Sequence, residues 1–177
     1  MGRQARRTLG ALLVLGIAVA VSAPGAAGTT GNETFSGTIV TSGVSGERVV
    51  VSSVIVAKGV FSGVGRVVEI QNLPGDPDNV SRDDLVFSDG TIHIVTTSDF
   101  ENASFTLNPH NCLFRGTVQQ TGIFAGGTGR FAAATGSYTG SVSGGGLLPR
   151  NPDGSCAFGQ ASLHEEDMVA SSGTLSF

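Results

Sequence analysis

The stretch GIFAGGTGRFAAATGSYTGSVSG, residues 122–144, has the pattern that decides the fold. It predicts a strand that ends at Phe124, a glycine turn, a short bulged segment over residues 130–135 and a second strand opened by Gly136. Glycine is favoured where the backbone takes a positive φ or passes close to another segment. The phenylalanine of the bulged segment is placed to close the end of a hydrophobic interior. We therefore interpret five residues as structural turn residues: Gly126, Gly127, Gly129, Phe131 and Gly136.

Short segments with strand character follow one another on both sides of this turn. The clearest is residues 113–124, in which Phe114, Val118 and Phe124 share one face and polar side chains occupy the other. The other segments with alternating or β-branched residues are 34–41, 47–61, 65–70, a hairpin over 85–97, and 103–107, 137–143 and 157–177.

This succession of segments predicts the architecture. It amounts to eight to ten strands separated by turn signals, with no alternation of strands and helices. The 27 glycines in 177 residues also oppose long helices. We predict an all-β fold, an antiparallel barrel in preference to an open sandwich, because closure removes exposed strand edges.

The glycine turn also indicates a family. The stretch of residues 122–144 resembles the allene oxide cyclase and dirigent superfamily, whose members carry a similar glycine–glycine–x–glycine–x–phenylalanine turn between barrel strands. It is also similar to a group of small secreted proteins of actinobacterial type. The resemblance implies an eight-stranded antiparallel, calycin-like β-barrel with an internal cavity, assembled as a homotrimer. It transfers architecture only, because no catalytic position of the family can be aligned with this chain.

The N-terminus has the layout of a secretory signal peptide. Arginines precede an uninterrupted apolar stretch over residues 9–21, which is too short for a transmembrane helix, and small residues follow. We predict cleavage after Ala27, export by either the general or the twin-arginine route, and a secreted single domain over residues 28–177. An uncleaved N-terminal membrane anchor is the alternative.

Composition and motifs exclude several classes of partner. The formal net charge is −4, and no block of like charges suggests a nucleic-acid partner. We expect no stable membrane insertion once the signal peptide is removed. The glycines have no strand–helix context and no Gly-Lys-Ser/Thr follows them, so we expect no nucleotide and no other cofactor.

Cysteine usage and a cluster of acids bear on structural stabilisation. Cys112 and Cys156 are the two cysteines, and in an exported protein we predict a disulfide between them rather than two buried thiols. Four acids near the proline-rich break are compatible with Ca²⁺ ligation, but their spacing does not fit a known calcium loop. We favour a solvated loop and expect no metal site. These acids are Asp76, Asp78, Asp83 and Asp84.

Six residues are candidates for contact with a ligand inside the barrel: Glu69, His93, Arg115, Gln119, Tyr138 and Glu165. A period of two shows which residues share a face, but not which face is inside. We favour a surface position for His93 and strand packing for Tyr138. For the polar run of residues 164–167 we favour a solvated strand edge over a lumenal carboxyl group with a raised pKa. For Arg130 we favour a solvated turn arginine over an anion site.

Three functions fit these observations. The first is binding of a small apolar or aromatic molecule in the barrel lumen. The second is an isomerase or cyclase of the allene oxide cyclase or dirigent type, which would act mainly by folding a reactive substrate. The third is a structural role in the cell envelope. A dry interior would favour binding, a lumenal carboxylate or arginine would strengthen the enzyme hypothesis, and a filled barrel would leave the structural role.

Overall fold

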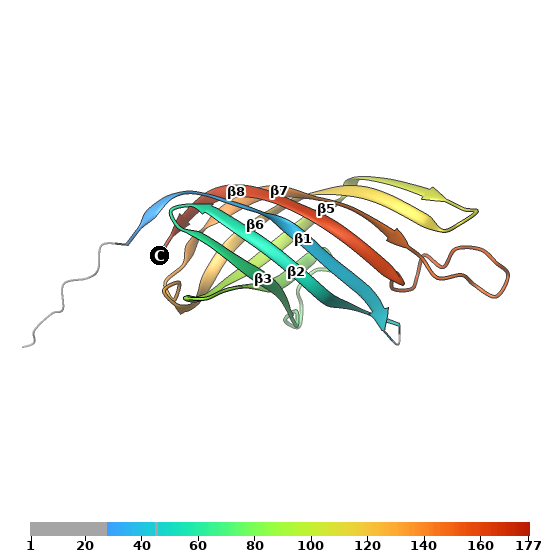
Figure 1. Cartoon of the computed structure of the whole chain (residues 1–177), viewed down its shortest axis with the longest axis horizontal. Coiled ribbons are helices and arrows are strands. Elements are labelled where there is room, and N and C mark those ends of the chain that lie inside the picture. The colour runs from blue at the N-terminus through green and yellow to red at the C-terminus, as the bar shows by residue number, and fades with distance from the viewer. Residues whose placement is uncertain (1–27, 45) are drawn as a thin grey trace, which may run out of the picture.

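The structure, a computed structural model, describes residues 28–44 and 46–177. The predicted signal peptide, residues 1–27, lies outside the described residues. Eight antiparallel strands pair in sequence order, and β1 pairs with β8 to close the barrel (Figure 1). The strands are β1 (Thr30–Val44), β2 (Glu47–Gly59), β3 (Ser62–Ile70), β4 (Val80–Phe87), β5 (Gly90–Asn108), β6 (Leu113–Gly129), β7 (Thr135–Leu147) and β8 (His164–Ser176). The predicted closed antiparallel barrel is therefore confirmed, and the open sandwich is wrong.

Several predicted strand limits need correction. Residues 103–107 are the second half of β5, which a bulge between Asp99 and Ser104 divides without ending. The bulge breaks the period-two pattern, so one strand gave the appearance of two. The strand that was expected to end at Phe124 continues to Gly129, because its glycines still pair with β5. The last strand begins at His164 and not at residue 157.

An aromatic plug closes the end of the barrel at which the described chain begins and ends. The plug consists of Phe61, Phe87, Phe131 and Phe177. Phe131 is fully buried, and its ring centroid lies 4.8 Å from that of Phe61 and 5.0 Å from that of Phe177. The predicted role of Phe131 is confirmed.

Arg130 lies against the outside of this plug. Its guanidinium carbon is 4.9 Å from the Phe177 ring centroid, and Nη1 forms an ion pair with Asp89 at 3.3 Å. The side chain remains exposed on the turn, as favoured from the sequence. It covers aromatic rings with its flat cationic group.

The turn glycines meet two separate steric requirements. Gly126, Gly129 and Gly136 have φ values of 91°, 57° and 129°, which side chains rarely adopt. Gly127 instead lies against β5, where an added Cβ would be 2.0 Å from the carbonyl oxygen of Thr91. The predicted turn residues are confirmed as structural residues.

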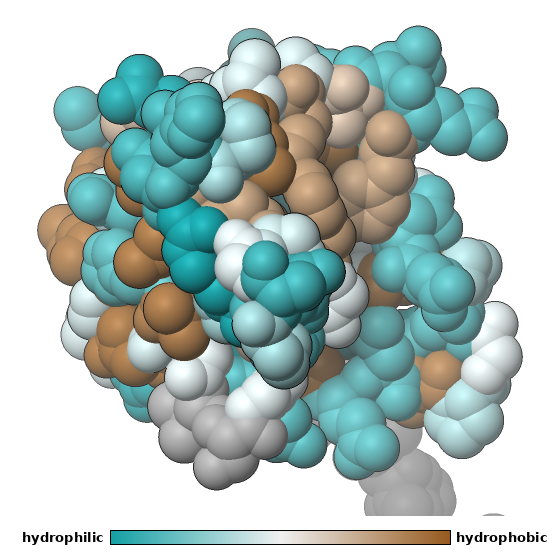
Figure 2. Space-filling view, turned by 90° about the vertical axis from the view of Figure 1, so that its right-hand side faces the viewer, coloured by the Kyte–Doolittle hydropathy of each residue, from teal (hydrophilic) through white to brown (hydrophobic). Residues whose placement is uncertain are grey.

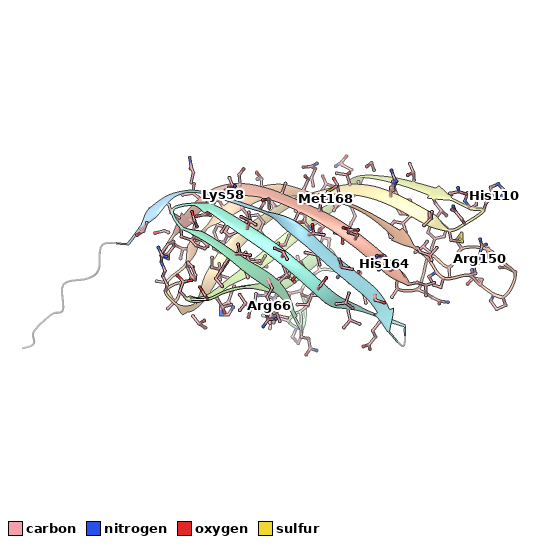
Figure 3. The ribbon with its side chains drawn as sticks, viewed as in Figure 1. Lys58, Arg66, His110, Arg150, His164 and Met168 are labelled. Carbon is pink, nitrogen blue, oxygen red and sulfur yellow. A yellow bond between two sulfur atoms is a disulfide. The ribbon has the colours of Figure 1, made fainter. Side chains whose placement is uncertain are left out.

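At the other end, the open end, β5, β6 and β7 extend beyond the barrel (Figure 1). The predicted Cys112–Cys156 disulfide is confirmed there, and it joins the β5–β6 turn to the β7–β8 loop. Arg150 donates hydrogen bonds to the carbonyl oxygens of His110 and Gly154, each at 2.5 Å. Figure 3 shows His110 and Arg150 together at this end of the molecule. The disulfide and the arginine therefore hold the extension together.

Glu33 is a buried carboxyl group at the closed end. Its Oε2 accepts a hydrogen bond from the backbone N–H of Phe61 at 3.1 Å, so it stabilises the β2–β3 turn. Burial raises the pKa of Glu33, with backbone hydrogen bonds acting in the opposite direction. It lies among the residues of the closed end and does not line the lumen cavity described below.

Candidate functional site: the barrel lumen

The lumen contains a cavity of about 580 Å³. Its lining begins at Phe35 and Phe124 above the aromatic plug and reaches Phe100 and Phe105, which are exposed at the open end. Figure 2 looks at the molecule from the open end and shows hydrophobic side chains beside hydrophilic ones on this face. The volume is that of an ordinary small-molecule site, roughly 300–1,000 Å³.

Three aromatic residues form the inner boundary of the cavity, which we call the aromatic floor: Phe35, Phe124 and Tyr138. The rings of Phe124 and Tyr138 have centroids 5.3 Å apart, and that of Phe35 is 5.8 Å from that of Phe124. Gly122 on β6 makes room for the tyrosine, because an added Cβ would lie 2.3 Å from the ring. The floor is therefore packed and apolar.

The hydroxyl group of Tyr138 is the polar group of this floor. It lies 2.5 Å from Oγ1 of Thr96 on β5. Burial raises the pKa of Tyr138 to about 12, and the hydrogen bond to Thr96 only partly offsets that effect. The hydroxyl therefore stays protonated at neutral pH and can donate a hydrogen bond.

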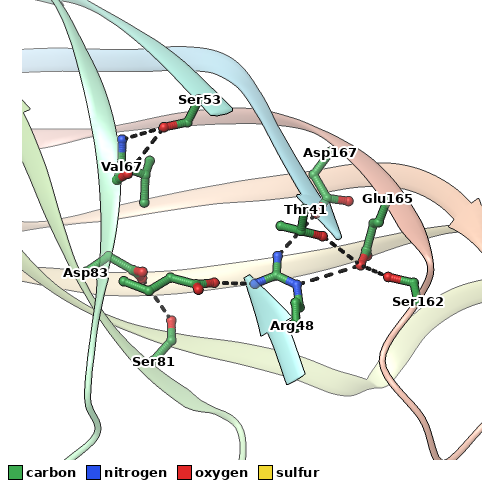
Figure 4. Close-up of polar contacts among 10 residues, drawn as sticks. Thr41, Arg48, Ser53, Val67, Ser81, Asp83, Ser162, Glu165 and Asp167 are labelled. Carbon is green, nitrogen blue, oxygen red and sulfur yellow. Dashed lines mark hydrogen bonds and ion pairs between the residues drawn. The ribbon is translucent and has the colours of Figure 1, made fainter. Parts of the chain in front are cut away.

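One side of the lumen carries charge, and we call it the carboxylate wall: Arg48, Glu69, Asp83, Glu165 and Asp167. Nη1 of Arg48 forms an ion pair with Glu69, while Nε is 3.7 Å from Glu165 and Nη2 is 3.6 Å from Asp167 (Figure 4). Neighbouring strands β2, β3 and β4 supply three members of this wall, and β8 supplies two. One guanidinium group therefore contacts several carboxyl groups of the same wall.

Local sequence explains how these charges fit inside. Glu165 accepts hydrogen bonds from Ser162 Oγ at 3.0 Å and Thr41 Oγ1 at 3.4 Å. Gly144 on β7 lies opposite Asp167, and an added Cβ there would be 1.9 Å from its Oδ1. Glycine at this position creates the space that the carboxyl group occupies.

Two carboxyl groups of this wall have strongly perturbed acidity. Burial raises the pKa of Asp83 to about 6, although a hydrogen bond from Ser81 favours its charged form. Burial, reinforced by the charge of Glu165, also raises the pKa of Asp167 to about 6, and Arg48 acts in the opposite direction. Both groups can therefore change charge near neutral pH.

The structure separates the six candidate ligand residues into two groups. Glu69, Tyr138 and Glu165 line the cavity. His93 lies on the outer face, where its Nδ1 is 2.5 Å from Asp84 Oδ1, so the favoured surface position is confirmed. Tyr138 is packed as expected and also faces the lumen cavity.

Arg115 and Gln119 do not line the lumen cavity. They alternate along β6 with Phe114, Val118 and Gln120, which do. The sequence had separated the two faces of this strand, but the face that carries Arg115 and Gln119 is the outer one. Their predicted lumenal position is therefore wrong. Gln119 borders a second hollow beside the β5 bulge, together with Thr97 and Asp99.

The interpretation of residues 164–167 as a solvated edge is wrong. Strand β8 is paired on both sides, with β1 and with β7, so it has no free edge. Glu165 and Asp167 face the lumen, while His164 and Glu166 are exposed. The alternative, a lumenal carboxyl group with a raised pKa, describes Asp167.

The solvated-loop interpretation also needs correction for two of the four acids. Strand β4 begins at Val80, so Asp83 and Asp84 lie in the strand and point to opposite faces. Asp76 stays in the loop and pairs with Arg82 at 2.7 Å. Across the described residues, no group of three or more histidine, cysteine, aspartate or glutamate side chains is arranged to hold a metal ion.

The lumenal polar groups outside the six candidates include three charged side chains and one amide: Arg48, Asp83, Asp167 and Gln120. Gln120 has the same parity as Phe114 and Phe124, so the alternation contained the signal for it. Asp167 likewise shares a face with Glu165. Arg48 and Asp83 carried no such signal, because each stands beside a turn or loop whose limits were uncertain from sequence.

Comparisons with known proteins do not add to this description. No family model matches the chain, and no curated protein and no solved structure shows significant similarity to it. Within the described ranges, none of the elements is a helix long and apolar enough to cross a membrane.

Asp167→Asn should stabilise the protein at neutral pH. Because the folded-state pKa of about 6 exceeds the value of 3.8 for a free side chain, the wild-type protein loses stability as pH rises between these values. The variant lacks this loss, so its free energy of unfolding should exceed that of the wild type by up to about 3 kcal/mol at pH 7.5. Urea unfolding at pH 4 and pH 7.5 measures the change.

The matched control is Glu166→Gln, which alters the exposed neighbour on the outer face. It should show no comparable gain between the two pH values. The prediction is that the difference in stability between Asp167→Asn and the wild type grows from pH 4 to pH 7.5. An equal difference at the two pH values would show that the lumenal carboxyl group is well solvated.

Proposed function

We propose that this chain is a secreted binding protein that holds a small, mainly apolar or aromatic molecule inside its barrel. The observation that carries the proposal is the cavity of about 580 Å³, bounded by the aromatic floor and open at one end. Apolar lining with a few converging polar groups is typical of small-molecule sites. Export is supported by the predicted signal peptide and by the disulfide, a bond typical of oxidising compartments.

A second candidate is an isomerase or cyclase of the allene oxide cyclase or dirigent type. The lumenal carboxyl groups of Asp83 and Asp167 favour it, because acids with a pKa of about 6 can donate or accept protons near neutrality. We place binding first because two polar groups of the lumen already have partners within the protein. Arg48 contacts carboxyl groups of its own wall, and the Tyr138 hydroxyl contacts Thr96. Mass spectrometry of a cell extract incubated with the protein separates the two, since only an enzyme would consume a molecule and yield its isomer.

The other expectations remain predictions. The kinship with the allene oxide cyclase and dirigent superfamily, the homotrimer and the absence of nucleic-acid and membrane partners rest on sequence reasoning. A filled interior would have favoured the structural role, whereas this barrel contains a cavity.

Val169→Phe should weaken ligand binding. Val169 on β8 lines the cavity, and a larger side chain there removes volume from the site. The neutral probe N-phenyl-1-naphthylamine should bind the wild type with one site and the variant at least about fivefold more weakly, since overpacking costs about 1–3 kcal/mol. Tyr138 is the one tyrosine of a chain without tryptophan, so quenching of tyrosine emission reports occupancy directly from the cavity floor.

The control is Met168→Phe, one residue earlier on the outer face, where Met168 is exposed. Figure 3 shows Met168 on the outside of β8. This variant should bind the probe like the wild type. Equal loss in both variants, or no quenching up to the solubility limit of the probe, would overturn the proposed site.

A further inference from the structure

The carboxylate wall determines the charge of the molecule that the lumen is built to take. Four of the cavity-lining side chains carry carboxyl groups and one carries a cation, counted over the described residues: Glu69, Asp83, Glu165 and Asp167 against Arg48. Acidic groups therefore exceed basic ones inside a partly water-excluded space. Such a space attracts positive charge and repels negative charge.

Arg48 is not available as an anchor for an anionic ligand. Its three nitrogen atoms are directed at three carboxyl groups, those of Glu69, Glu165 and Asp167. An anion would have to displace one of these groups and would also meet the remaining carboxylates. The guanidinium group is therefore explained as an internal counterion of the wall.

Two acids of the wall are left poorly compensated. Asp167 is 8% exposed, and the cation that faces it, Arg48, is 3.6 Å away and is shared with two other carboxyl groups. Asp83 has Ser81 Oγ at 3.2 Å and forms no ion pair with the described residues. A buried carboxylate without full compensation lowers stability, and a bound cation removes that deficit.

Aromatic rings border the same space. Tyr138 and Phe124 form its floor, and Phe100, Phe105 and Phe114 line it toward the open end. The faces of aromatic rings attract ammonium groups, and this attraction is strongest where water is excluded. Aromatic faces, apolar volume and uncompensated carboxyl groups together are the chemistry that binds an organic cation.

We propose that the lumen binds an amphiphilic cation, with its apolar body on the aromatic floor and an amine or quaternary ammonium group directed at the carboxylate wall, to which Asp83 and Asp167 belong. This inference rests on the proposed function and deepens it by naming the ligand class.

Three probes with one apolar body test the proposal: 2-naphthylmethylammonium, 2-naphthylmethanol and 2-naphthoate. Isothermal titration calorimetry at pH 7.5 should show that the ammonium compound binds at least about tenfold more tightly than the alcohol, and that the carboxylate binds most weakly. The three differ mainly in the charge of one substituent. Differences in affinity among them therefore report the charge preference of the lumen.

The preference for the ammonium probe should shrink at pH 5. The titratable groups that face the lumen are Asp83 on β4, Asp167 and Glu165 on β8, Glu69 on β3 and Tyr138 on β7, with Arg48 on β2. Asp83 and Asp167, whose pKa values are about 6, become mostly protonated at pH 5 and lose their attraction for the probe. The affinity for the alcohol should change little.

Asp83→Asn and Asp167→Asn should each lower the affinity for the ammonium probe severalfold and leave that for the alcohol unchanged. Asp84→Asn is the matched control, because Asp84 adjoins Asp83 in sequence but contacts His93 on the outer face. Two independent variants keep the test valid if one of them fails to fold.

The outcomes separate this inference from the proposed function. Equal binding of all three probes, or tightest binding of the carboxylate, would overturn the cation preference and leave a ligand-binding lumen. Failure of every probe to bind would overturn the proposed function and the inference with it. A tight ammonium complex that is unaffected by both aspartate substitutions would refute the assigned role of the wall.

Discussion

Replacing both Cys112 and Cys156 by alanine is expected to lower the free energy of unfolding by about 4 kcal/mol on the chain-entropy account of disulfides. The bond spans 44 residues, and this long loop includes the whole of β6, the β6–β7 turn and the whole of β7. Without the bond, the unfolded chain regains that conformational freedom. Alanine is the appropriate replacement because both cysteines are buried beside Leu148 in a small apolar cluster.

Urea unfolding with and without a reducing agent measures this effect. The reductant should bring the wild type close to the variant and leave the variant unchanged. Because the bond holds the extension at the open end, we also expect the variant to lose hydrogen-exchange protection first in the β5–β6 turn and the β7–β8 loop. A variant as stable as the wild type would show that the extension is held by its other contacts alone.

Gly127→Ala is expected to destabilise the barrel by about 3 kcal/mol or more, because overpacking against rigid backbone cannot be relieved by side-chain movement. The new Cβ would lie 2.0 Å from the carbonyl oxygen of Thr91 and 2.7 Å from that of Phe131. Relief would require separating β6 from β5 or shifting the turn that carries the plug. Both changes would loosen the closed end.

The control is Gly159→Ala in the β7–β8 loop, where an added Cβ meets nothing within 4 Å. It should change the midpoint of thermal unfolding by little, whereas Gly127→Ala should lower it by many degrees or prevent folding. If the two variants have the same midpoint of thermal unfolding, the close approach at Gly127 does not determine the turn.

The fold was largely predictable because its main requirements are local. The turn glycines, the alternation along β6 and the succession of short strands predicted an antiparallel all-β fold, while closure was inferred from the need to remove strand edges and from the family resemblance. The length of β5 was not predictable, since the bulge between Asp99 and Ser104 removes the period-two signal at its centre. Such a bulge is set by its neighbours in the sheet as well as by its own residues.

The site was only half predictable, for a different reason. Alternation separated Gln119 from Gln120, but it could not say which of the two faces inward, and Asp83 was assigned to a loop and not to a strand. That information comes from closure of the barrel, in which Phe35 and Phe124 mark the lumenal face. Charges on the lumenal face also contradict the usual rule that polar residues lie outside, so Asp167 was placed at a solvated edge.

The proposed function offers an explanation for this exception. A barrel selected for stability alone would fill its lumen with apolar side chains. Here Gly144 leaves room for Asp167, and Gly122 leaves room for Tyr138. Small residues thus maintain both the polar wall and the aromatic floor around an open volume.

A crystal structure of the protein soaked with 2-naphthylmethylammonium tests the central claim most directly. We expect the naphthyl ring inside the barrel on Phe124 and Tyr138, with the ammonium nitrogen against the carboxylate wall. A lumen filled by side chains, or a probe bound only to the outer surface, would contradict the claim that this barrel is built around a ligand cavity.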